Sequence, residues 1–224
     1  MSSREHKEHT TPHVSNLGGA APHMKRFLDI VLGGALLIAC VPAVIICVLV
    51  VRLIDGGPGF FVQPREGLGG RMFRMWKIRT MTVNADTYLK EWLRHHPDRE
   101  EEWRGYGRLQ NDPRLLPIVG AFLRRASIDE MPQLWNVVKG DMSLVGPRPL
   151  DAGSVAMVGP NVLEIRRCVR PGLTGLWQVS GRSDLDLLSM VRIDDEYVRS
   201  WSISLDLRIL ALTPKAVLTR RGAF

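Results

Sequence analysis

The longest apolar segment of the chain lies near its N-terminus and carries no charged residue from Ile30 to Val51. A helix rises about 1.5 Å per residue, so a segment of this length can cross roughly 30 Å of hydrocarbon. We therefore predict a membrane helix over residues 24–54, retained in the mature protein because no small-residue cleavage site accompanies it. Residues 1–23 mix Ser, Thr, His, Gly and Pro without an apolar period, which is typical of a disordered tail.

Two features of this helix bear on whether it crosses the membrane completely. Pro42 lies near the middle, where a proline removes a backbone hydrogen bond and bends the helix. Lys25, Arg26 and Arg52 flank its two ends, so the distribution of positive charge does not separate a cytoplasmic end from an outer end. This pattern favours a re-entrant helix that breaks at Pro42 and returns to the same face. A kinked helix that spans the membrane is the alternative.

Beyond the membrane helix, short apolar segments alternate with turns rich in Gly and Pro. The glycines of residues 67–70 separate two short apolar stretches, which predicts a β-hairpin. Residues 83–106 are strongly charged, with Leu89, Trp92 and other apolar residues spaced for one helical face. This pattern predicts a helical segment on the surface of the domain, ended by Pro97.

Two further segments predict helices at a membrane surface. Residues 118–125 place Phe122 and Leu123 on one side and end in two arginines, so this helix can lie at the headgroup plane. An ordinary helix facing the core is the alternative. The apolar run 205–212 is interrupted by charges and too short to span, which favours an interfacial or docking helix. We predict an α+β fold, mostly helical: the re-entrant helix, then a small cytoplasmic domain, residues 55–224, with interfacial amphipathic helices and a short β-hairpin.

Composition adds the expectation of an anionic partner. The chain has 224 residues, 45% of them hydrophobic, and a formal net charge of +7. Nucleic acid, a phosphorylated small molecule and an anionic membrane surface would all suit this charge. The basic residues are spread along turns, and no recognition-helix pattern is present, so we expect no nucleic-acid partner.

The densest candidate chemistry lies in residues 120–150, where two neighbouring carboxylates, Asp129 and Glu130, are bracketed by cations. The flanking cations are Arg124, Arg125, Lys139 and Arg148, the last in a rigid Gly-Pro-Arg-Pro turn. Fixed positive charge around an acid pair would hold phosphates beside a carboxylate. Neighbours on a helix differ in direction by about 100°, so two separate roles are expected. One carboxylate could attack phosphorus while the other holds Mg²⁺.

A structural alternative exists for the same acid pair. Ser127 and Glu130 match the spacing of a capping box, in which both residues only satisfy backbone groups. Pro132 argues against it, because it would fall fifth in that helix, where its nitrogen cannot donate a hydrogen bond. A helix start nearer Asp129 puts the proline in the first turn. Asp129 then lies at the positive end of the helix dipole, where a carboxylate is expected to stay ionised.

Other polar residues are spaced to contact anions. Lys77 and Arg79 alternate with apolar residues, so both cations can face one side of an extended segment. A solvated edge strand is the alternative. Residues 166–182 have glycines at turns and predict a second anion-contacting loop. Its projecting polar residues are Arg170, Gln178 and Arg182.

A series of ordered motifs resembles one family from Lys25 to the C-terminus. They are KRFLDIVLGGALL followed by a proline, GGPGFFVQPREGLGG, KIRTM, NDPRL, LRRASIDEMPQLWNVVKGDMSLVGPRP, RPGLTGLWQVSGR and EYVRSWSISLDLRIL. The chain resembles the bacterial sugar transferases, the monotopic polyprenyl-phosphate hexose-1-phosphate transferases, most closely those that initiate exopolysaccharide repeat units. Two places depart from the family pattern: Val41 precedes Pro42 where serine is usual, and the loop 63–67 reads QPREG.

The resemblance implies a two-step transfer through an aspartyl-phosphosugar intermediate. The donor is a UDP-hexose, UMP leaves, and undecaprenyl phosphate accepts the hexose-1-phosphate. Asp129 is then the nucleophile and Glu130 the Mg²⁺ partner, the two carboxylates together forming the metal site. Similarity further implies substrate-binding roles for a set of polar residues. These are Lys77, Arg124, Arg148, Arg170 and Asp194.

The resemblance also implies a location and leaves several points open. It places the protein at the bacterial inner membrane, with the phosphoglycosyl transferase domain, residues 55–224, in the cytoplasm. A noncatalytic membrane-anchored scaffold for later glycosyltransferases is the alternative function. The hexose, galactose or glucose, stays open, as does the choice between a monomer and a homo-oligomer.

Overall fold

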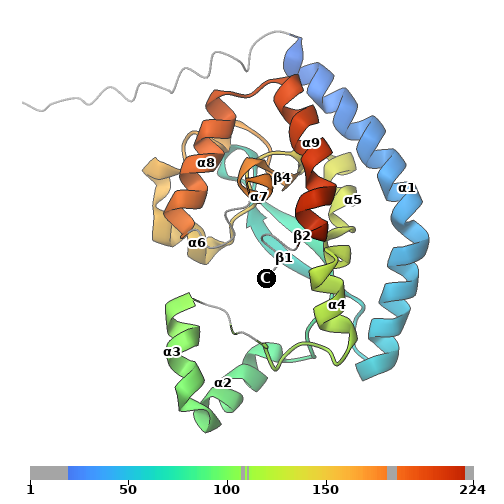
Figure 1. Ribbon diagram of the computed structural model, residues 1–224, viewed down its shortest axis with the longest axis vertical. Helices are drawn as coiled ribbons and strands as arrows, with labels where there is room; N and C mark the ends of the chain where they lie inside the picture. The colour runs from blue at the N-terminus through green and yellow to red at the C-terminus, as the bar shows by residue number, and fades with distance from the viewer. Residues whose placement is uncertain (1–19, 107–108, 110, 181–185, 220–224) are drawn as a thin grey trace, which may run out of the picture.

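One long helix, α1 (Ala21–Asp55), arches around a small domain made mostly of helices in the computed structural model (Figure 1). The structure describes residues 20–106, 109, 111–180 and 186–219. The helices of the domain are α2 (Ala85–His95), α3 (Pro97–Tyr106), α4 (Val119–Arg125), α5 (Gln133–Lys139), α6 (Ala152–Val158), α7 (Leu176–Val179), α8 (Leu187–Arg199) and α9 (Ile203–Leu218). The predicted α+β fold, mostly helical, is confirmed.

Two small sheets support these helices. Strands β1 (Phe60–Glu66) and β2 (Met72–Ile78) form the predicted antiparallel hairpin. Its turn places Gly69 and Gly70 at positive φ, which glycine adopts without steric cost. Strands β3 (Ser143–Val145) and β4 (Gly172–Thr174) form a parallel pair that the sequence analysis missed.

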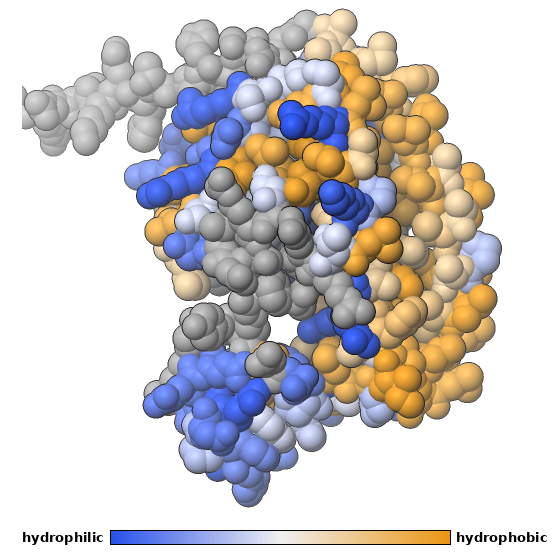
Figure 2. Space-filling model, viewed as in Figure 1, coloured by the Kyte–Doolittle hydropathy of each residue, from blue (hydrophilic) through white to orange (hydrophobic). Residues whose placement is uncertain are grey.

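The face that α1 turns to the domain is a narrow stripe that runs along the whole helix. Its members recur every three or four residues, as one face of a helix requires: Asp29, Gly33, Leu37, Cys40, Val44, Val48 and Val51. Between the charged residues near its two ends, the rest of the surface of α1 is apolar, and many of its side chains are exposed; the exposed fraction of Ile38, for example, is 76%. Figure 2 shows these apolar side chains covering one side of the molecule.

Polar contacts attach the N-terminal end of α1 to the domain. The Lys25 ammonium lies 2.5 Å from the Asp206 carboxylate and donates to the carbonyl of Val145 at 2.9 Å. Arg26 donates to the carbonyls of Val137 and Val138, so a cation satisfies the C-terminal carbonyls of α5. None of these pairings was predicted, because they join residues more than a hundred positions apart.

Asp29 adds a buried contact at the same end of α1. Its exposed fraction is 4%, and its Oδ1 accepts from the Ser143 hydroxyl and the Leu144 amide, both at 2.9 Å. Asp206 is held equally firmly, since it also accepts from Tyr197 at 2.7 Å and from the Trp201 indole at 3.1 Å. The first turns of α1 are therefore joined to β3 and α9 by charged and neutral hydrogen bonds.

The C-terminal half of α1 packs on the same domain through apolar contacts. Val51 is fully buried in a cluster with Ile78, Leu116 and Leu123. A side chain at Gly59 would meet Val48 at 2.5 Å, so glycine lets the following loop fold back against the helix. The helix is continuous from Ala21 to Asp55 with Pro42 inside it.

Several predicted elements differ in detail from those observed. The membrane helix begins at Ala21 rather than at residue 24, and residues 1–19 of the predicted tail lie outside the described residues. Helix α2 ends before Pro97 as predicted, but the chain continues as α3, because proline is tolerated in the first turn of a helix.

Two amphipathic helices also differ from their predictions. Phe122 and Leu123 were predicted on one side of α4, but Leu123 is buried whereas Phe122 is 55% exposed. Helix α9 extends to Leu218, well beyond the predicted run 205–212. Asp206, which interrupted the apolar pattern, is a buried ion-pair partner on the face of α9 that packs against the domain.

We expect Asp29→Ala to lower the thermal unfolding midpoint of the protein in detergent. The substitution leaves the Leu144 amide and the Ser143 hydroxyl without their acceptor, which costs roughly 2 kcal/mol or more for buried donors. Asp29→Asn keeps an acceptor oxygen and should lose less. Glu91→Ala, at an exposed position of α2, serves as the control and should change stability by less than about 0.5 kcal/mol. Equal midpoints for wild type and Asp29→Ala would contradict this role.

Candidate active site

The two carboxylates of the candidate site lie on a tight turn. Asp129 and Glu130 belong to a 3₁₀ turn, η3 (Ile128–Glu130), and α5 begins only after Pro132. Ser127 adopts φ 54°, ψ 22° and makes no side-chain capping bond, so the capping-box alternative is wrong. A helical turn begins near Asp129 as predicted, but it is a 3₁₀ turn. The α-helix itself begins at Gln133.

Burial and charge separate the two neighbouring carboxylates. Asp129 is 7% exposed, and burial raises its pKa to about 6, with Glu130 adding to the rise and Lys77 and Arg124 opposing it. The helix dipole was expected to keep Asp129 ionised by lowering its pKa. Burial outweighs that effect, because removal from solvent disfavours the charged form. Burial acts on Glu130 too, but the positive charges of Lys77 and Arg148 outweigh it and lower the pKa of Glu130 to about 2.

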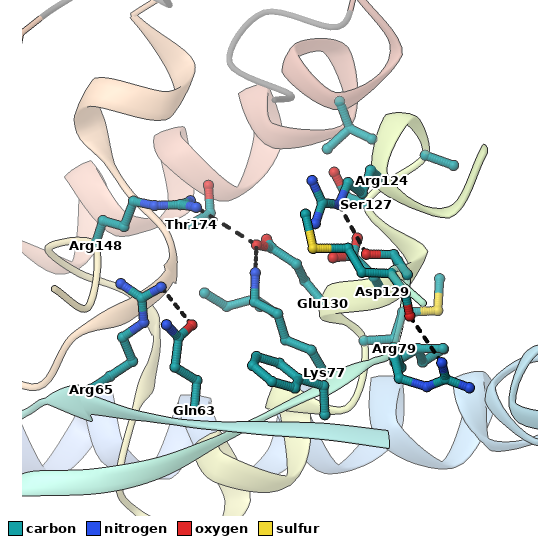
Figure 3. Close-up of a pocket in the computed structure, with 18 of the residues that line it drawn as sticks. Gln63, Arg65, Lys77, Arg79, Arg124, Ser127, Asp129, Glu130, Arg148 and Thr174 are labelled. Atoms are coloured by element: carbon teal, nitrogen blue, oxygen red, sulfur yellow. Dashed lines mark hydrogen bonds and ion pairs between the residues drawn. The ribbon is translucent and has the colours of Figure 1, made fainter. Parts of the chain in front are cut away.

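Cations from three separate segments converge on this pair (Figure 3). Lys77 at the end of β2 donates to Glu130 Oε1 at 2.8 Å. Arg148 places a guanidinium nitrogen 3.9 Å from the same oxygen, and its side chain is 37% exposed. Arg124, at the end of α4, approaches from the Asp129 side and donates to the Thr80 hydroxyl at 2.9 Å. Lys77, Arg124 and Arg148, for which similarity implies substrate binding, thus lie around the acid pair.

Arg65 on β1 joins this set, and the sequence analysis did not select it. It shares the inward face of the hairpin with Gln63 and Lys77, as the two-residue period of strands requires. The Arg65 guanidinium contacts Asp151 at 2.9 Å and Gln63 at 2.8 Å, and its charge lowers the pKa of Glu130. The same alternation that identified Lys77 and Arg79 could have identified Gln63 and Arg65.

The turn that carries Arg148 is held from behind by a buried ion pair. Arg166 donates to the carbonyl of Arg148 and lies 3.1 Å from Asp194. Asp194, 1% exposed, does not line the cavity, so it contributes by positioning this turn and not by contact with a ligand. The Arg148 guanidinium also lies 5.7 Å from the ring centroid of Trp177, within the range of a cation–π contact.

Glycines allow the turn that carries Arg148 to pack closely against β4. The Gly146 amide donates to the Thr174 carbonyl at 2.9 Å, and the Gly172 amide donates to the Pro147 carbonyl at 2.8 Å. A Cβ on Gly146 would lie 2.5 Å from the Arg170 carbonyl, which no side chain tolerates. The Gly-Pro-Arg-Pro turn is thus locked against β4.

The remaining predicted residues lie in different surroundings. Arg79 lines the cavity, but its guanidinium is engaged by Asp55, the Pro58 carbonyl and the Met81 carbonyl. Gln178 also lines the cavity, and its Oε1 is buried without a hydrogen-bond partner among the described residues. Arg170 lies away from the cavity and donates to the Gly140 carbonyl at 2.8 Å.

Two further cations of the initial set do not reach the acid pair. Lys139, at the far end of α5, is exposed and pairs with Asp141 at 3.0 Å. Arg125 is exposed and donates to a carbonyl of its own helix. Arg182 lies outside the described residues.

These groups surround one large cavity of about 1240 Å³, which opens in front of the acid pair. Its polar end holds Asp129, Glu130 and the cations Arg65, Lys77, Arg124 and Arg148. The cations outnumber the carboxylates, so the cavity is suited to a ligand carrying several negative charges.

The donor set can be compared with what a metal ion needs. The described residues contain no cluster of three or more His, Cys, Asp or Glu side chains. Mg²⁺ is commonly bound by only one or two carboxylates together with substrate phosphates. Glu130, ionised and with one oxygen engaged by Lys77, and Asp129 beside it fit that sparse pattern.

Comparison with known proteins places this site in a family. A family model described as "Bacterial sugar transferase" matches residues 20–220. The chain belongs to the bacterial sugar transferase family. The resemblance seen in the motifs is thereby confirmed, and the matched region includes α1 as well as every residue of the site.

Individual relatives are identical to this chain at about two fifths of the aligned positions. Exopolysaccharide production protein ExoY of Rhizobium meliloti (strain 1021) is 41% identical over 211 residues, covering 94% of this chain and 91% of that protein. Undecaprenyl-phosphate galactose phosphotransferase of Salmonella typhimurium and an uncharacterized sugar transferase of Haemophilus influenzae are 43% and 44% identical over 201 residues. The chain spans only 42% of the length of each of these two relatives.

We expect Lys77→Met to raise the pKa values of both carboxylates. Lys77 lowers the pKa of Asp129 and that of Glu130, so removal of its charge should move the Asp129 titration above about pH 6 and the Glu130 titration up from about pH 2. Carboxyl carbon shifts followed by NMR through a pH titration measure this change. Lys77→Arg keeps the charge and is the matched control. An unchanged Asp129 titration in Lys77→Met would show that Lys77 does not act on this group.

Proposed function

We propose that this family member transfers a hexose-1-phosphate from a UDP-hexose to undecaprenyl phosphate and so initiates assembly of an exopolysaccharide repeat unit. The observation that carries the proposal is the buried Asp129 beside an ionised Glu130, within a cavity whose cations outnumber its acids. The name of the Salmonella relative, an undecaprenyl-phosphate galactose phosphotransferase, supports the acceptor.

In the first displacement, a carboxylate oxygen of Asp129 attacks the β-phosphorus of the UDP-hexose. The bond from that phosphorus to the bridging oxygen breaks, and UMP leaves with the oxygen. The product is an aspartyl-phosphosugar. With a pKa of about 6, Asp129 is mostly ionised at neutral pH and needs no separate base.

In the second displacement, a phosphate oxygen of undecaprenyl phosphate attacks the same phosphorus. The bond to Asp129 breaks, the carboxylate is regenerated, and the sugar leaves as a polyprenyl diphosphate derivative. Both substrates are anions, so each must approach a carboxylate against its charge. Lys77, Arg124 and Arg148 offset that repulsion, because cations already fixed around the site stabilise developing negative charge.

Glu130 is suited to a different task from Asp129. Its low pKa keeps it charged, and Lys77 and Arg148 restrain it, so it would hold Mg²⁺ together with Asp129 and the donor phosphates. When bound, Mg²⁺ would neutralise charge on the transferring phosphoryl group. Gln178 also lines the cavity, and we assign it to binding of the donor.

We further propose that α1 enters the bacterial inner membrane and returns to the cytoplasmic face. A helix that crossed the bilayer would carry its two ends to opposite sides. Here Lys25 and Arg26 near one end and Val51 near the other contact the same domain. The arch of α1 with Pro42 near its middle suits re-entry, since proline frees a backbone carbonyl and favours bending.

We expect Asp129→Asn to abolish release of UMP from every UDP-hexose, including UDP-galactose and UDP-glucose. An amide oxygen is a poor nucleophile, whereas the side-chain shape is nearly conserved. Single-turnover release of UMP by purified protein with Mg²⁺ measures the effect, and an unchanged unfolding midpoint shows that the fold is intact. A covalent phosphosugar adduct on Asp129→Asn would refute the assignment. A wild-type protein that releases no UMP from any donor would favour the noncatalytic scaffold.

The pH profile of the wild type gives an independent check on the same residue. Because burial raises the pKa of Asp129 to about 6, the protonated, inactive form predominates below that pH. The value of kcat/KM for the donor, which reports ionisation in the free enzyme, should fall about tenfold per pH unit below 6 and level off above it. Loss of activity only below about pH 4 would contradict the raised pKa.

Topology can be tested by labelling from the periplasm. We expect tags at residues 5 and 224 both to be shielded in intact cells and both to react after permeabilisation. Re-entry keeps the two ends of α1 on the cytoplasmic side, whereas a spanning helix exposes one of them. Periplasmic labelling of the tag at residue 5 alone would show that α1 spans.

A further inference from the structure

The cavity continues past the acid pair into a region without charges, which we call the apolar arm. The arm is formed by Leu36 of α1, Leu144 of β3, Leu173 of β4, and Leu210 and Val217 of α9. The proposed chemistry at Asp129 uses none of these residues. A cavity with charges at one end and apolar side chains at the other is suited to an amphiphilic ligand.

The arm exists because two helices diverge from a shared point of attachment. The ion pair between Lys25 and Asp206 joins α1 and α9 at one end, and only a small cavity of about 20 Å³ remains between them there. Figure 1 shows the helices separating beyond that point. The large cavity opens between Leu36 and Leu210, about three helical turns beyond Lys25 on α1 and about one turn beyond Asp206 on α9.

The mouth of the arm is continuous with the apolar surface of the protein. Leu36, which lines the arm, is 48% exposed and lies among the exposed apolar side chains of α1. Leu218 of α9, which also lines the cavity, is 81% exposed. A lipid chain lying against α1 in the membrane could therefore pass between the two helices without crossing a charged barrier.

The inner end of the arm meets the polar end of the cavity at two hydroxyl groups. Thr174 of β4 and Thr213 of α9 are hydrogen-bonded at 2.9 Å, and both line the cavity. Thr174 is 5% exposed and lies beside Arg148 and Glu130 in Figure 3. The change from apolar to charged lining thus occurs next to the cations that surround the acid pair.

We propose that the apolar arm binds the isoprene units nearest the phosphate of the polyprenyl acceptor. The phosphate then lies among the cations while the rest of the chain leaves between α1 and α9 into the bilayer. This inference rests on the proposed function for the identity of the acceptor. It assigns to α9 a role in acceptor binding that is separate from the donor chemistry at Asp129.

The test fills the arm and measures the two displacements separately. Leu210→Trp and Val217→Trp each place a large side chain in the arm, at two different positions along α9. Protein in lipid nanodiscs is first treated with a UDP-hexose alone, and single-turnover release of UMP is followed. Undecaprenyl phosphate is then added to the loaded protein, and formation of the lipid-linked product is followed.

We expect the two variants to release UMP within about twofold of wild type, because the donor does not enter the arm. Transfer to undecaprenyl phosphate should fall roughly tenfold or more, the order expected when an apolar subsite no longer accommodates its group. Leu212→Trp is the matched control, since Leu212 lies on the same helix, is 39% exposed and does not line the cavity. It should leave both steps unchanged.

The remaining outcomes each overturn the assignment in a recognisable way. Unaltered transfer in both arm variants would place the acceptor chain elsewhere. Equal loss of both steps would assign the arm to the donor. Geranyl phosphate, which keeps only the isoprene units nearest the phosphate, should show the same loss in the variants, and full transfer to this short acceptor would exclude those units from the arm.

Failure of the proposed function would look different. Wild-type protein would then release no UMP from any UDP-hexose, and the arm would be tested by binding alone. Native mass spectrometry would measure how much undecaprenyl phosphate each protein retains. Retention by wild type and by Leu212→Trp, but not by Leu210→Trp or Val217→Trp, would support binding in the arm. Equal retention by all four proteins would refute it.

Discussion

The attachment of one long apolar helix to a small domain at both ends is the constraint on which the site depends. At the first end the contacts are ionic and buried: Lys25 would be a costly unpaired charge without Asp206, as Asp29 would be without its two donors. At the other end they are apolar, with Val51 in the core. Strand β3 is fixed by the ionic end and leads directly into the turn that carries Arg148, so the helix and the cations around the acid pair share one framework.

The acid pair shows how position alone can give two adjacent carboxylates different properties. Asp129 faces a region with little solvent and its pKa rises, whereas Glu130 faces Lys77 and Arg148 and its pKa falls. Divergent surroundings of this kind are what separates a nucleophile from a purely electrostatic partner in carboxylate pairs. Both carboxylates belong to the same 3₁₀ turn, so the divergence comes from the charges around each side chain and not from the secondary structure that carries it.

Features encoded by neighbouring residues were predictable, and those that depend on distant contacts were not. The membrane helix and the hairpin follow from local periodicity, and Pro132 correctly excluded the capping box. The pair β3–β4 escaped prediction because three-residue strands are too short to show a period. Arg166 and Arg170 look equivalent in sequence, yet only Arg166 supports the Arg148 turn, since the choice depends on where α8 presents Asp194.

The double use of α1, as membrane element and as one wall of the cavity, limits how the protein could change. An unrelated transmembrane helix could tether the domain to a bilayer, but it would supply neither the stripe that covers the core nor Leu36 beside α9. The anchor is consequently not a detachable module. Deleting α1 to make a water-soluble form would expose part of the domain core and remove one wall of the cavity. Catalysis and attachment to the membrane therefore depend on the same helix.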